Sequence, residues 1–245
     1  MEPIFTKEYD ITDMCVDCFG NLKPSVILMF AQEVAGMHCL ELACHYDTLR
    51  KQHLFWAVAR HRVQITRLPR IGEKIRVETW PMPTTRAAYP RSVVAYDGAG
   101  NECFRAISLW VLMDTDTRNM ILPGKSGIVV SGTLRGGELV PPASLAVKNL
   151  GRATQRQVRF SDLDRNGHMN NTRYTEWAAD LLPSSFHAGR RIREFTVCYL
   201  SEAREGQTLS LGWEVREDDG LYVNAVRFGE EKEERIFSAQ ILFDE

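Results

Sequence analysis

The sequence predicts an α+β protein built from two repeats, each a curved antiparallel sheet wrapped around a helix. The first observation is a short segment that occurs twice, because residues 17–22 match residues 164–169 with an aspartate and a glycine in register. The second is a helical pattern after each segment. The third is the strands and hairpin turns after each helix, an order typical of α+β domains.

The helix of the first repeat is expected at about residues 23–50. Its beginning, residues 26–31, is apolar without a break, so apolar side chains surround the helix instead of lining one stripe. Such a helix is buried rather than lying on a surface. A long buried helix wrapped by a curved antiparallel sheet is the hotdog arrangement, and two copies in one chain predict a double hotdog.

The strands have the same order in both repeats. A strand pair broken at a glycine occupies residues 63–80 in the first repeat and residues 197–213 in the second. Each repeat ends in a strong strand, at residues 106–114 and 236–244. We therefore expect each repeat to run strand, helix and then antiparallel strands.

The segment between the repeats has linker composition. Residues 131–154 contain four glycines and two prolines, which interrupt helices and strands. We expect an N-terminal repeat at residues 1–130, the linker at 131–154 and a C-terminal repeat at 155–245. The N-terminal repeat is expected to be a non-catalytic substrate tunnel, because the polar group described next is confined to the C-terminal repeat.

Asp164, Asn166 and His168 form the candidate catalytic group. Their i, i+2, i+4 spacing would point all three side chains to one side of an extended segment. In the N-terminal repeat Phe19 and Asn21 stand in place of Asn166 and His168, so only the second copy keeps the amide and the imidazole. Asp-x-Asn-Gly is also ordinary turn chemistry, and that alternative stays open at this point.

A second helix is expected directly after this group, with Asn170 and Asn171 as candidates for its N-cap. Its apolar face would consist of Tyr174, Trp177, Ala178, Leu181 and Leu182. Unpaired N–H groups and the positive end of the helix dipole can polarise a carbonyl oxygen at such a place. The layout therefore favours hydrolysis of an acyl bond.

Composition narrows the functional classes. A formal charge of −2 and a pI near 6.3 give no electrostatic reason to expect nucleic-acid binding. The longest apolar run is too short to span a bilayer, and the first residues lack the basic and apolar regions of a secretory signal. The cytoplasm is therefore the expected compartment.

The six cysteines should be reduced in that compartment. Cys15 and Cys18 have the C-x-x-C spacing of a metal or redox site, but no second pair follows. Cys39 and Cys44 would face different directions, because they stand five residues apart on the expected helix. Neither a metal nor an organic cofactor is expected.

Nearly the whole chain resembles the acyl-acyl carrier protein thioesterase family of plants and bacteria. The family pattern D-x-N-x-H-x-N-N-x-x-Y is met by Asp164, Asn166, His168, Asn170, Asn171 and Tyr174. A W-x-x-M element is met by Trp110 and Met113. The resemblance implies a double hotdog whose active site lies in the C-terminal repeat, and a catalytic carboxylate on the strand after the motif helix, which falls on Glu202.

This resemblance implies a thiolester hydrolase that releases free fatty acid from acyl carrier protein and so ends fatty-acid synthesis. Asp164 or Glu202 would act as general base on water or as nucleophile, while Asn166 and His168 position the reactants and steady the oxyanion. Plant members carry a cysteine directly after the glutamate, where this chain has Ala203. A carboxylate mechanism is therefore favoured over a cysteine nucleophile.

The expected partner is an acidic acyl carrier protein that carries the fatty acyl chain, and a homodimer is left open. Candidate docking residues are basic and include Arg190 to Arg193 and Arg204. The alternatives are a hotdog acyl-CoA thioesterase, a hotdog hydratase, and an acyl-binding or lipid-sensing protein without turnover. Joint retention of a carboxylate, an amide and an imidazole argues against the last.

Overall fold

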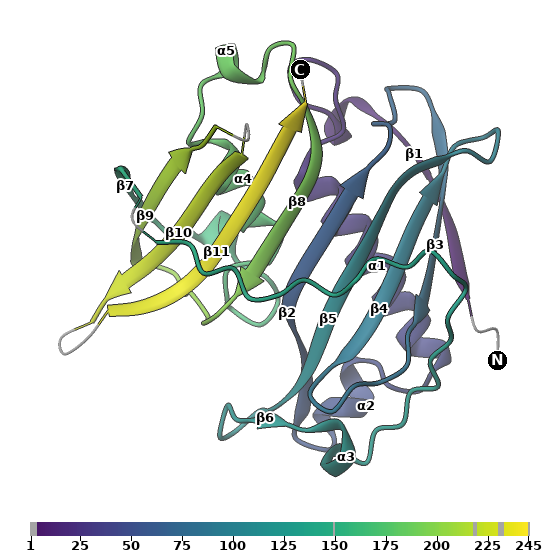
Figure 1. The fold of residues 1–245 in the computed structure, drawn as a ribbon. Helices are drawn as coiled ribbons and strands as arrows, with labels where there is room; N and C mark the ends of the chain where they lie inside the picture. The colour runs from purple at the N-terminus through teal and green to yellow at the C-terminus, as the bar shows by residue number, and fades with distance from the viewer. Residues whose placement is uncertain (1–3, 149, 218–219, 230–232, 245) are drawn as a thin grey trace. The chain divides into compact units, whose positions relative to one another are not determined.

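The computed structural model describes residues 4–148, 150–217, 220–229 and 233–244 (Figure 1). The chain divides into two units, Met1–Pro141 and Pro142–Glu245, which we call unit 1 and unit 2. Each unit contains an antiparallel sheet and a few helices, as expected for an α+β protein. The strand β7 begins at Arg152, inside the segment 131–154 whose composition predicts a linker.

In unit 1 a five-stranded sheet lies against one long helix. The strands have the order β1-β3-β4-β5-β2, all neighbours are antiparallel, and the short β6 pairs with β5. The elements are β1 (Phe5–Asp10), α1 (Pro24–Glu41), α2 (Tyr46–Arg50), β2 (Leu54–Ile65), β3 (Lys74–Pro81), β4 (Tyr89–Tyr96), β5 (Glu102–Asp114), β6 (Met120–Ile121) and α3 (Pro123–Ser126), with a 3₁₀ turn at Asp13–Cys15.

The helix α1 is buried along its first half, as the unbroken apolar run predicts. Ile27, Leu28 and Val34 have no exposed surface, whereas Met29 is 52% exposed. The predicted length is wrong, because α1 ends at Glu41 and a separate short helix, α2, begins at Tyr46. Ala43 adopts a left-handed φ of 54°, which turns the chain away from the helix axis.

In unit 2 the strands have the order β8-β11-β10-β9-β7, again with antiparallel neighbours. The elements are β7 (Arg152–Gln157), α4 (Arg173–Ala179), α5 (Ser184–His187), β8 (Arg191–Tyr199), β9 (Thr208–Val215), β10 (Gly220–Phe228) and β11 (Glu233–Asp244), with a 3₁₀ turn at Phe160–Asp162. Trp177, Phe195 and Phe237 are fully buried in this unit. Its helix α4 has seven residues and is much shorter than α1.

The two units share one topology, which confirms the repeat seen in the sequence. Numbering the strands within each unit gives the same neighbour order, 1-3-4-5-2. The loops correspond as well, since the Gly72 N–H donates to the Ile11 carbonyl at 2.9 Å and the Gly206 N–H donates to the Val158 carbonyl at 2.9 Å. The duplication therefore extends to individual hydrogen bonds.

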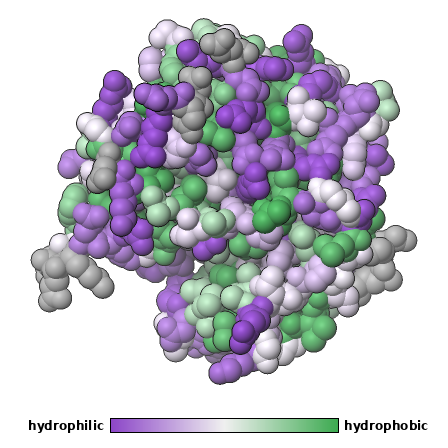
Figure 2. Space-filling view, viewed as in Figure 1, coloured by the Kyte–Doolittle hydropathy of each residue, from purple (hydrophilic) through white to green (hydrophobic). Residues whose placement is uncertain are grey.

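No helix among the described residues is long and apolar enough to cross a membrane. On the face seen in Figure 2, hydrophilic side chains are interspersed with hydrophobic ones.

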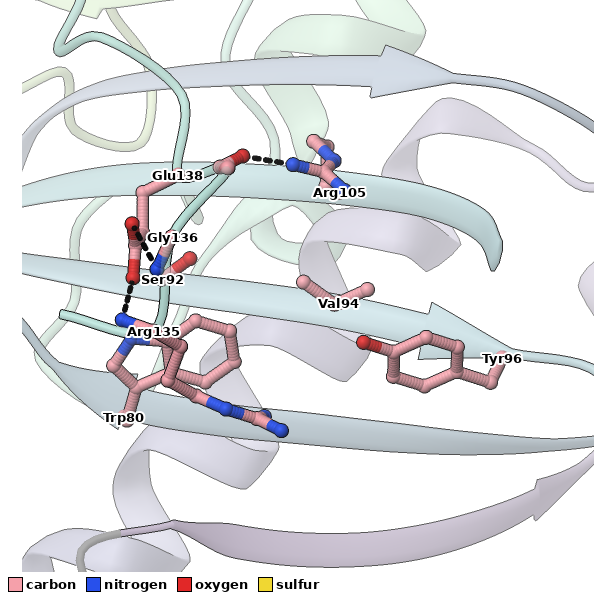
Figure 3. A pocket seen from close by; sticks show the side chains of 9 residues that line it. Trp80, Ser92, Val94, Tyr96, Arg105, Arg135, Gly136 and Glu138 are labelled. Carbon is pink, nitrogen blue, oxygen red and sulfur yellow. Dashed lines mark hydrogen bonds between the residues drawn. The ribbon is translucent and has the colours of Figure 1, made fainter. Parts of the chain in front are cut away.

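Residues 131–138 run along the sheet of unit 1 and close a small cavity of about 170 Å³ (Figure 3). The segment comes so near the sheet that a Cβ at Gly132 would lie 2.1 Å from the Met82 carbonyl carbon. The cavity contains two guanidinium groups, of Arg105 and Arg135, and carboxylates of Glu102 and Glu78 already bind them. With its charged groups paired inside the protein, this cavity is a poor candidate for a reaction centre.

Candidate active site

Asp164 lies at the start of a tight loop in unit 2, between two residues that form an isolated β-bridge, Leu163 and Met169. The Asp164 N–H donates to the His168 carbonyl at 2.8 Å, and the Gly167 N–H donates to the Asp164 carbonyl at 3.0 Å. Gly167 has a left-handed φ of 75°, which glycine adopts without strain. The segment is therefore a turn, and the extended conformation assumed from the sequence is wrong.

The Asp164 carboxylate organises this loop. Its Oδ1 accepts the N–H of Asn166 at 2.8 Å and the N–H of His168 at 3.3 Å. Its Oδ2 lies 3.5 Å from the Asn166 side-chain amide. The Oδ1 of Asp164 therefore has the ordinary role of an aspartate in a turn, which is to accept main-chain N–H groups.

Unit 1 contains the same loop without the amide and imidazole side chains. The Oδ1 of Asp17 accepts the N–H of Phe19 at 2.9 Å and the N–H of Asn21 at 3.0 Å. Gly20 has a φ of 79° and its N–H donates to the Asp17 carbonyl at 3.0 Å. Because this bonding is independent of the residues at positions 19 and 21, the aspartate has a loop-forming function that both copies share.

Glu202 and His168 meet in unit 2. The Glu202 Oε2 lies 3.1 Å from the His168 Nε2, and the Arg204 Nη2 lies 3.8 Å from the same oxygen. The His168 side chain is 12% exposed and that of Glu202 is 40% exposed. A carboxylate with an imidazole on one side and solvent access on the other can take a proton from water or attack an electrophile.

Backbone contacts hold this pair together. Glu202 follows β8 and stands in the loop after it, three residues past the strand end at Tyr199, so the expected position on the strand itself is slightly displaced. The Met169 N–H donates to the Ala203 carbonyl at 2.8 Å, which fastens the His168 loop to the Glu202 loop. The contact is therefore supported by a main-chain bond between the residues that directly follow His168 and Glu202.

The beginning of α4 differs from the expected cap. The N-cap residue is Thr172, and its N–H and hydroxyl both donate to the Asn170 Oδ1, at 3.0 and 2.9 Å. The Asn171 carbonyl accepts the hydroxyl of Tyr199 at 3.0 Å. The N–H groups of residues 169, 170, 172 and 173 all have protein acceptors. Those amides are not available for an oxyanion, so the side chains of the loop are better candidates.

Tyr174, which the sequence places on the apolar helix face and in the family pattern without a catalytic role, lies at the site. Its side chain is 3% exposed, and burial, followed by the nearby Glu202 and Asp164 carboxylates, raises its pKa well above the usual value. The ring packs edge-on against Phe237, with ring centroids 4.8 Å apart. Its hydroxyl lies at the Ala203 N–H, beside Glu202. The family pattern already contained this tyrosine, so the signal was present in the sequence.

Among the described residues no group of three or more His, Cys, Asp or Glu side chains is placed to hold a metal ion. The four predicted site residues fall into two sets. Structure brings His168 and Glu202 into contact and brings Asp164 and Asn166 into contact. The two sets lie on two neighbouring loops of unit 2, the loop of residues 163–169 and the loop after β8, which the bond from the Met169 N–H to the Ala203 carbonyl joins.

Comparison with known proteins gives matches over most of the chain. The family model described as acyl-ACP thioesterase N-terminal domain matches residues 2–122, and that described as acyl-ACP thioesterase C-terminal domain matches residues 148–245. The oleoyl-acyl carrier protein thioesterase of Coriandrum sativum is 29% identical over 71% of this chain and 52% of its own length. The chain spans about half the length of the curated oleoyl-acyl carrier protein thioesterases that it matches.

Solved structures confirm the double hotdog class of fold. An acyl-ACP thioesterase from Bacteroides thetaiotaomicron superimposes with a TM-score of 0.87 at 24% identity, covering 99% of this chain and 98% of the other. The 12:0-ACP thioesterase from Umbellularia californica gives a TM-score of 0.84 at 22% identity, covering 100% and 98%.

Proposed function

Because the chain belongs to the acyl-ACP thioesterase family, we propose that it hydrolyses fatty acyl thioesters of acyl carrier protein to free fatty acid and carrier thiol. The observation that carries this proposal is the 3.1 Å contact between Glu202 and His168 beside the Asp164 loop. In unit 1 the loop persists, but Leu68 occupies the position of Glu202. We therefore assign the hydrolysis of the thioester to unit 2.

In the proposed reaction Glu202 acts as the general base. Its carboxylate takes a proton from a water molecule, and the water oxygen attacks the carbonyl carbon of the thioester. The side chains of Asn166 and His168 stabilise the negative charge on the carbonyl oxygen. When the tetrahedral intermediate collapses, the carbon–sulfur bond breaks and the thiolate leaves with a proton that Glu202 or His168 returns. Direct attack by Glu202 to form a mixed anhydride is the second route open to the same carboxylate.

Asp164 is proposed to position the loop rather than to act as base. Substituting Asp164 with asparagine keeps an Oδ1 acceptor for the N–H groups of Asn166 and His168, so we expect kcat to fall by no more than about tenfold. Substituting it with alanine removes that acceptor and should lower kcat by about 10²-fold or more, because the His168 ring loses its position. Steady-state thioesterase assays on the two variants measure the difference.

Asp17→Ala is the matched control for this pair. It breaks the equivalent loop of unit 1, and its effect on stability in a denaturant titration shows what loss of the loop alone costs. If the asparagine and alanine variants of Asp164 are equally inactive while both remain folded, the charge of Asp164 is needed and the positioning role is wrong.

Acyl carrier protein is the proposed carrier, and the loops of the site present basic side chains to it. Arg165 is exposed and lies within the Asp164 loop, and the Arg204 side chain is 57% exposed beside Glu202. Basic residues at the rim of a site increase the rate of association with an acidic partner. The cytoplasm is the proposed compartment, supported by six cysteines that are all free. A homodimer is not part of the proposal.

Thiol release from matched acyl-carrier-protein and acyl-CoA esters tests the proposed function. With the same acyl chain on both carriers, we expect kcat/KM for the carrier-protein ester to be at least about tenfold higher, and rising salt to reduce it. A preference for CoA esters would reassign the enzyme to acyl-CoA hydrolysis. Tight acyl binding without thiol release would contradict the enzymatic proposal.

A further inference from the structure

Two cysteines of unit 1 lie together where α1 ends, and the proposed hydrolysis does not use them. The Cys44 N–H donates to the Cys39 carbonyl at 3.0 Å, and the Ala43 N–H donates to the Leu40 carbonyl at 3.4 Å. With the left-handed Ala43 between them, these bonds form a Schellman motif, in which the first and last side chains touch. The motif thus places the two thiols close enough for each to shift the pKa of the other, with Cys44 favouring the thiolate of Cys39. The prediction that they face different directions is wrong.

A buried arginine lies against this pair. Arg91 is on β4 and 6% exposed, and its guanidinium is close enough to Cys39 to lower the pKa of that thiol. Its Nη1 lies 3.1 Å from the His38 Nδ1 and 3.2 Å from the Thr79 Oγ1. Burial lowers the pKa of Arg91, and among the described residues the groups that act against this are Cys39 and Cys44 rather than a carboxylate.

A buried cation needs a nearby anion, because removing an unpaired charge from water is strongly unfavourable. The thiol that contacts Arg91 can supply that anion. Hydrogen bonding from Cys44, together with the charge of Arg91, lowers the pKa of Cys39 to about 7. The pKa of Cys44 is raised, since Cys44 is the donor to that thiolate and is itself buried.

We propose that Cys39 is a reactive thiolate that forms a disulfide with Cys44 when a hydroperoxide oxidises it. The Cys39 sulfur attacks one peroxide oxygen, the oxygen–oxygen bond breaks, and hydroxide or alkoxide leaves, so that Cys39 becomes a sulfenic acid. The Cys44 thiol then attacks the Cys39 sulfur, and water leaves as the sulfur–sulfur bond forms. Two thiols are oxidised and one hydroperoxide is reduced.

The surroundings permit both steps. Cys39 is half-buried, which admits a small peroxide, and Cys44 is 3% exposed, which shields it from direct oxidation. The Trp56 Nε1 donates to the Cys44 carbonyl at 2.8 Å, so the backbone of Cys44 is held beside the end of α1. The disulfide would therefore tie the last turn of α1 to the segment that leads into α2.

Cys103 is a matched control inside the same chain. Its thiol lies 3.5 Å from the Arg67 Nη2, yet Arg67 is also bound by Glu73 and Asp97. Burial raises the pKa of Cys103, with the Arg67 charge acting in the opposite direction. Arg67, which already has carboxylate partners, does not lower the pKa of Cys103 below its usual value. Cys103 should therefore not react with the hydroperoxide.

The test treats the full chain with hydrogen peroxide, alkylates the remaining thiols after denaturation, and maps them by peptide mass spectrometry. We expect the peptide containing Cys39 and Cys44 to lose both alkylation sites and to regain them after reduction, while Cys103 stays fully alkylated. In Cys44→Ala, dimedone should label Cys39 instead. If Cys39 and Cys44 stay reduced while the exposed Cys18 is oxidised, the proposal is wrong.

The role of Arg91 is measured by the rate of alkylation of native protein by iodoacetamide as a function of pH. In the wild-type chain Cys39 should reach half of its maximal rate near pH 7. Arg91→Gln should slow the reaction at pH 7 by about five- to tenfold, since a higher pKa reduces the thiolate fraction more than it increases nucleophilicity. Should Arg91→Gln fail to fold, Cys44→Ala tests the other cause of the lowered Cys39 pKa and should likewise slow the reaction at pH 7. An unchanged rate in a folded variant would overturn the proposal.

Discussion

Substituting Glu202 with glutamine is expected to lower kcat for acyl thioester hydrolysis by about 10²–10⁴-fold, with a much smaller change in KM. Glutamine has nearly the same shape and keeps an oxygen near the His168 ring, which lies 3.1 Å from Glu202. It cannot accept a proton from water or form an anhydride. The loss therefore reports the carboxylate chemistry rather than a change in packing.

Glu205→Gln is the control for this variant. Glu205 is exposed in the same loop, three residues before β9 begins at Thr208. Its substitution removes the same charge without changing the contact between Glu202 and His168. We expect its kcat to stay within about twofold of the wild-type value, as for most surface changes. Wild-type kcat in Glu202→Gln would remove Glu202 from the reaction and return the base role to Asp164.

Phe104→Ala and Phe237→Ala should each lower the free energy of unfolding by about 3–5 kcal/mol. The two phenylalanines are at equivalent positions of β5 and β11, and both have no exposed surface. Removing a ring from either site leaves a cavity that the neighbouring strands cannot fill. Guanidinium titrations followed by circular dichroism give the change in unfolding free energy.

The two variants should differ in activity. Phe237 packs edge-on against Tyr174, whose hydroxyl lies beside Glu202, whereas Phe104 belongs to unit 1. At a temperature where both variants are folded, kcat should fall more in Phe237→Ala than in Phe104→Ala. Equal kcat values would show that the Tyr174 ring does not hold the site in place.

The fold was predictable because the residues that match between the two repeats are ones that determine backbone conformation. The aspartate and glycine of each loop, the apolar start of α1 and the glycine after each long strand all determine local structure directly. The end of α1 was not predictable in the same way. Residues 42–50 continue a helical composition, and only the left-handed turn at Ala43, a residue that rarely adopts it, ends the helix.

The sequence named the candidate residues of the site but not their geometry. The motif named Asp164, Asn166 and His168, and the family resemblance added Glu202, but spacing alone could not tell a turn from a strand. The Asp164 Oδ1 holds the loop by accepting main-chain N–H groups, and a pattern of side chains in the sequence does not reveal such bonds. The Glu202–His168 contact joins residues 34 positions apart, and it exists because the Met169 N–H bonds to Ala203.

The loop at Asp17 also bears on how duplicated domains diverge. Its conformation depends on an aspartate oxygen and a left-handed glycine, so substitutions at positions 19 and 21 leave the frame intact. After gene duplication one copy could lose its reactive side chains by neutral drift while folding stayed under selection. Selection on structure and selection on chemistry thus act on different residues of the same six-residue segment, which lets the two properties evolve separately.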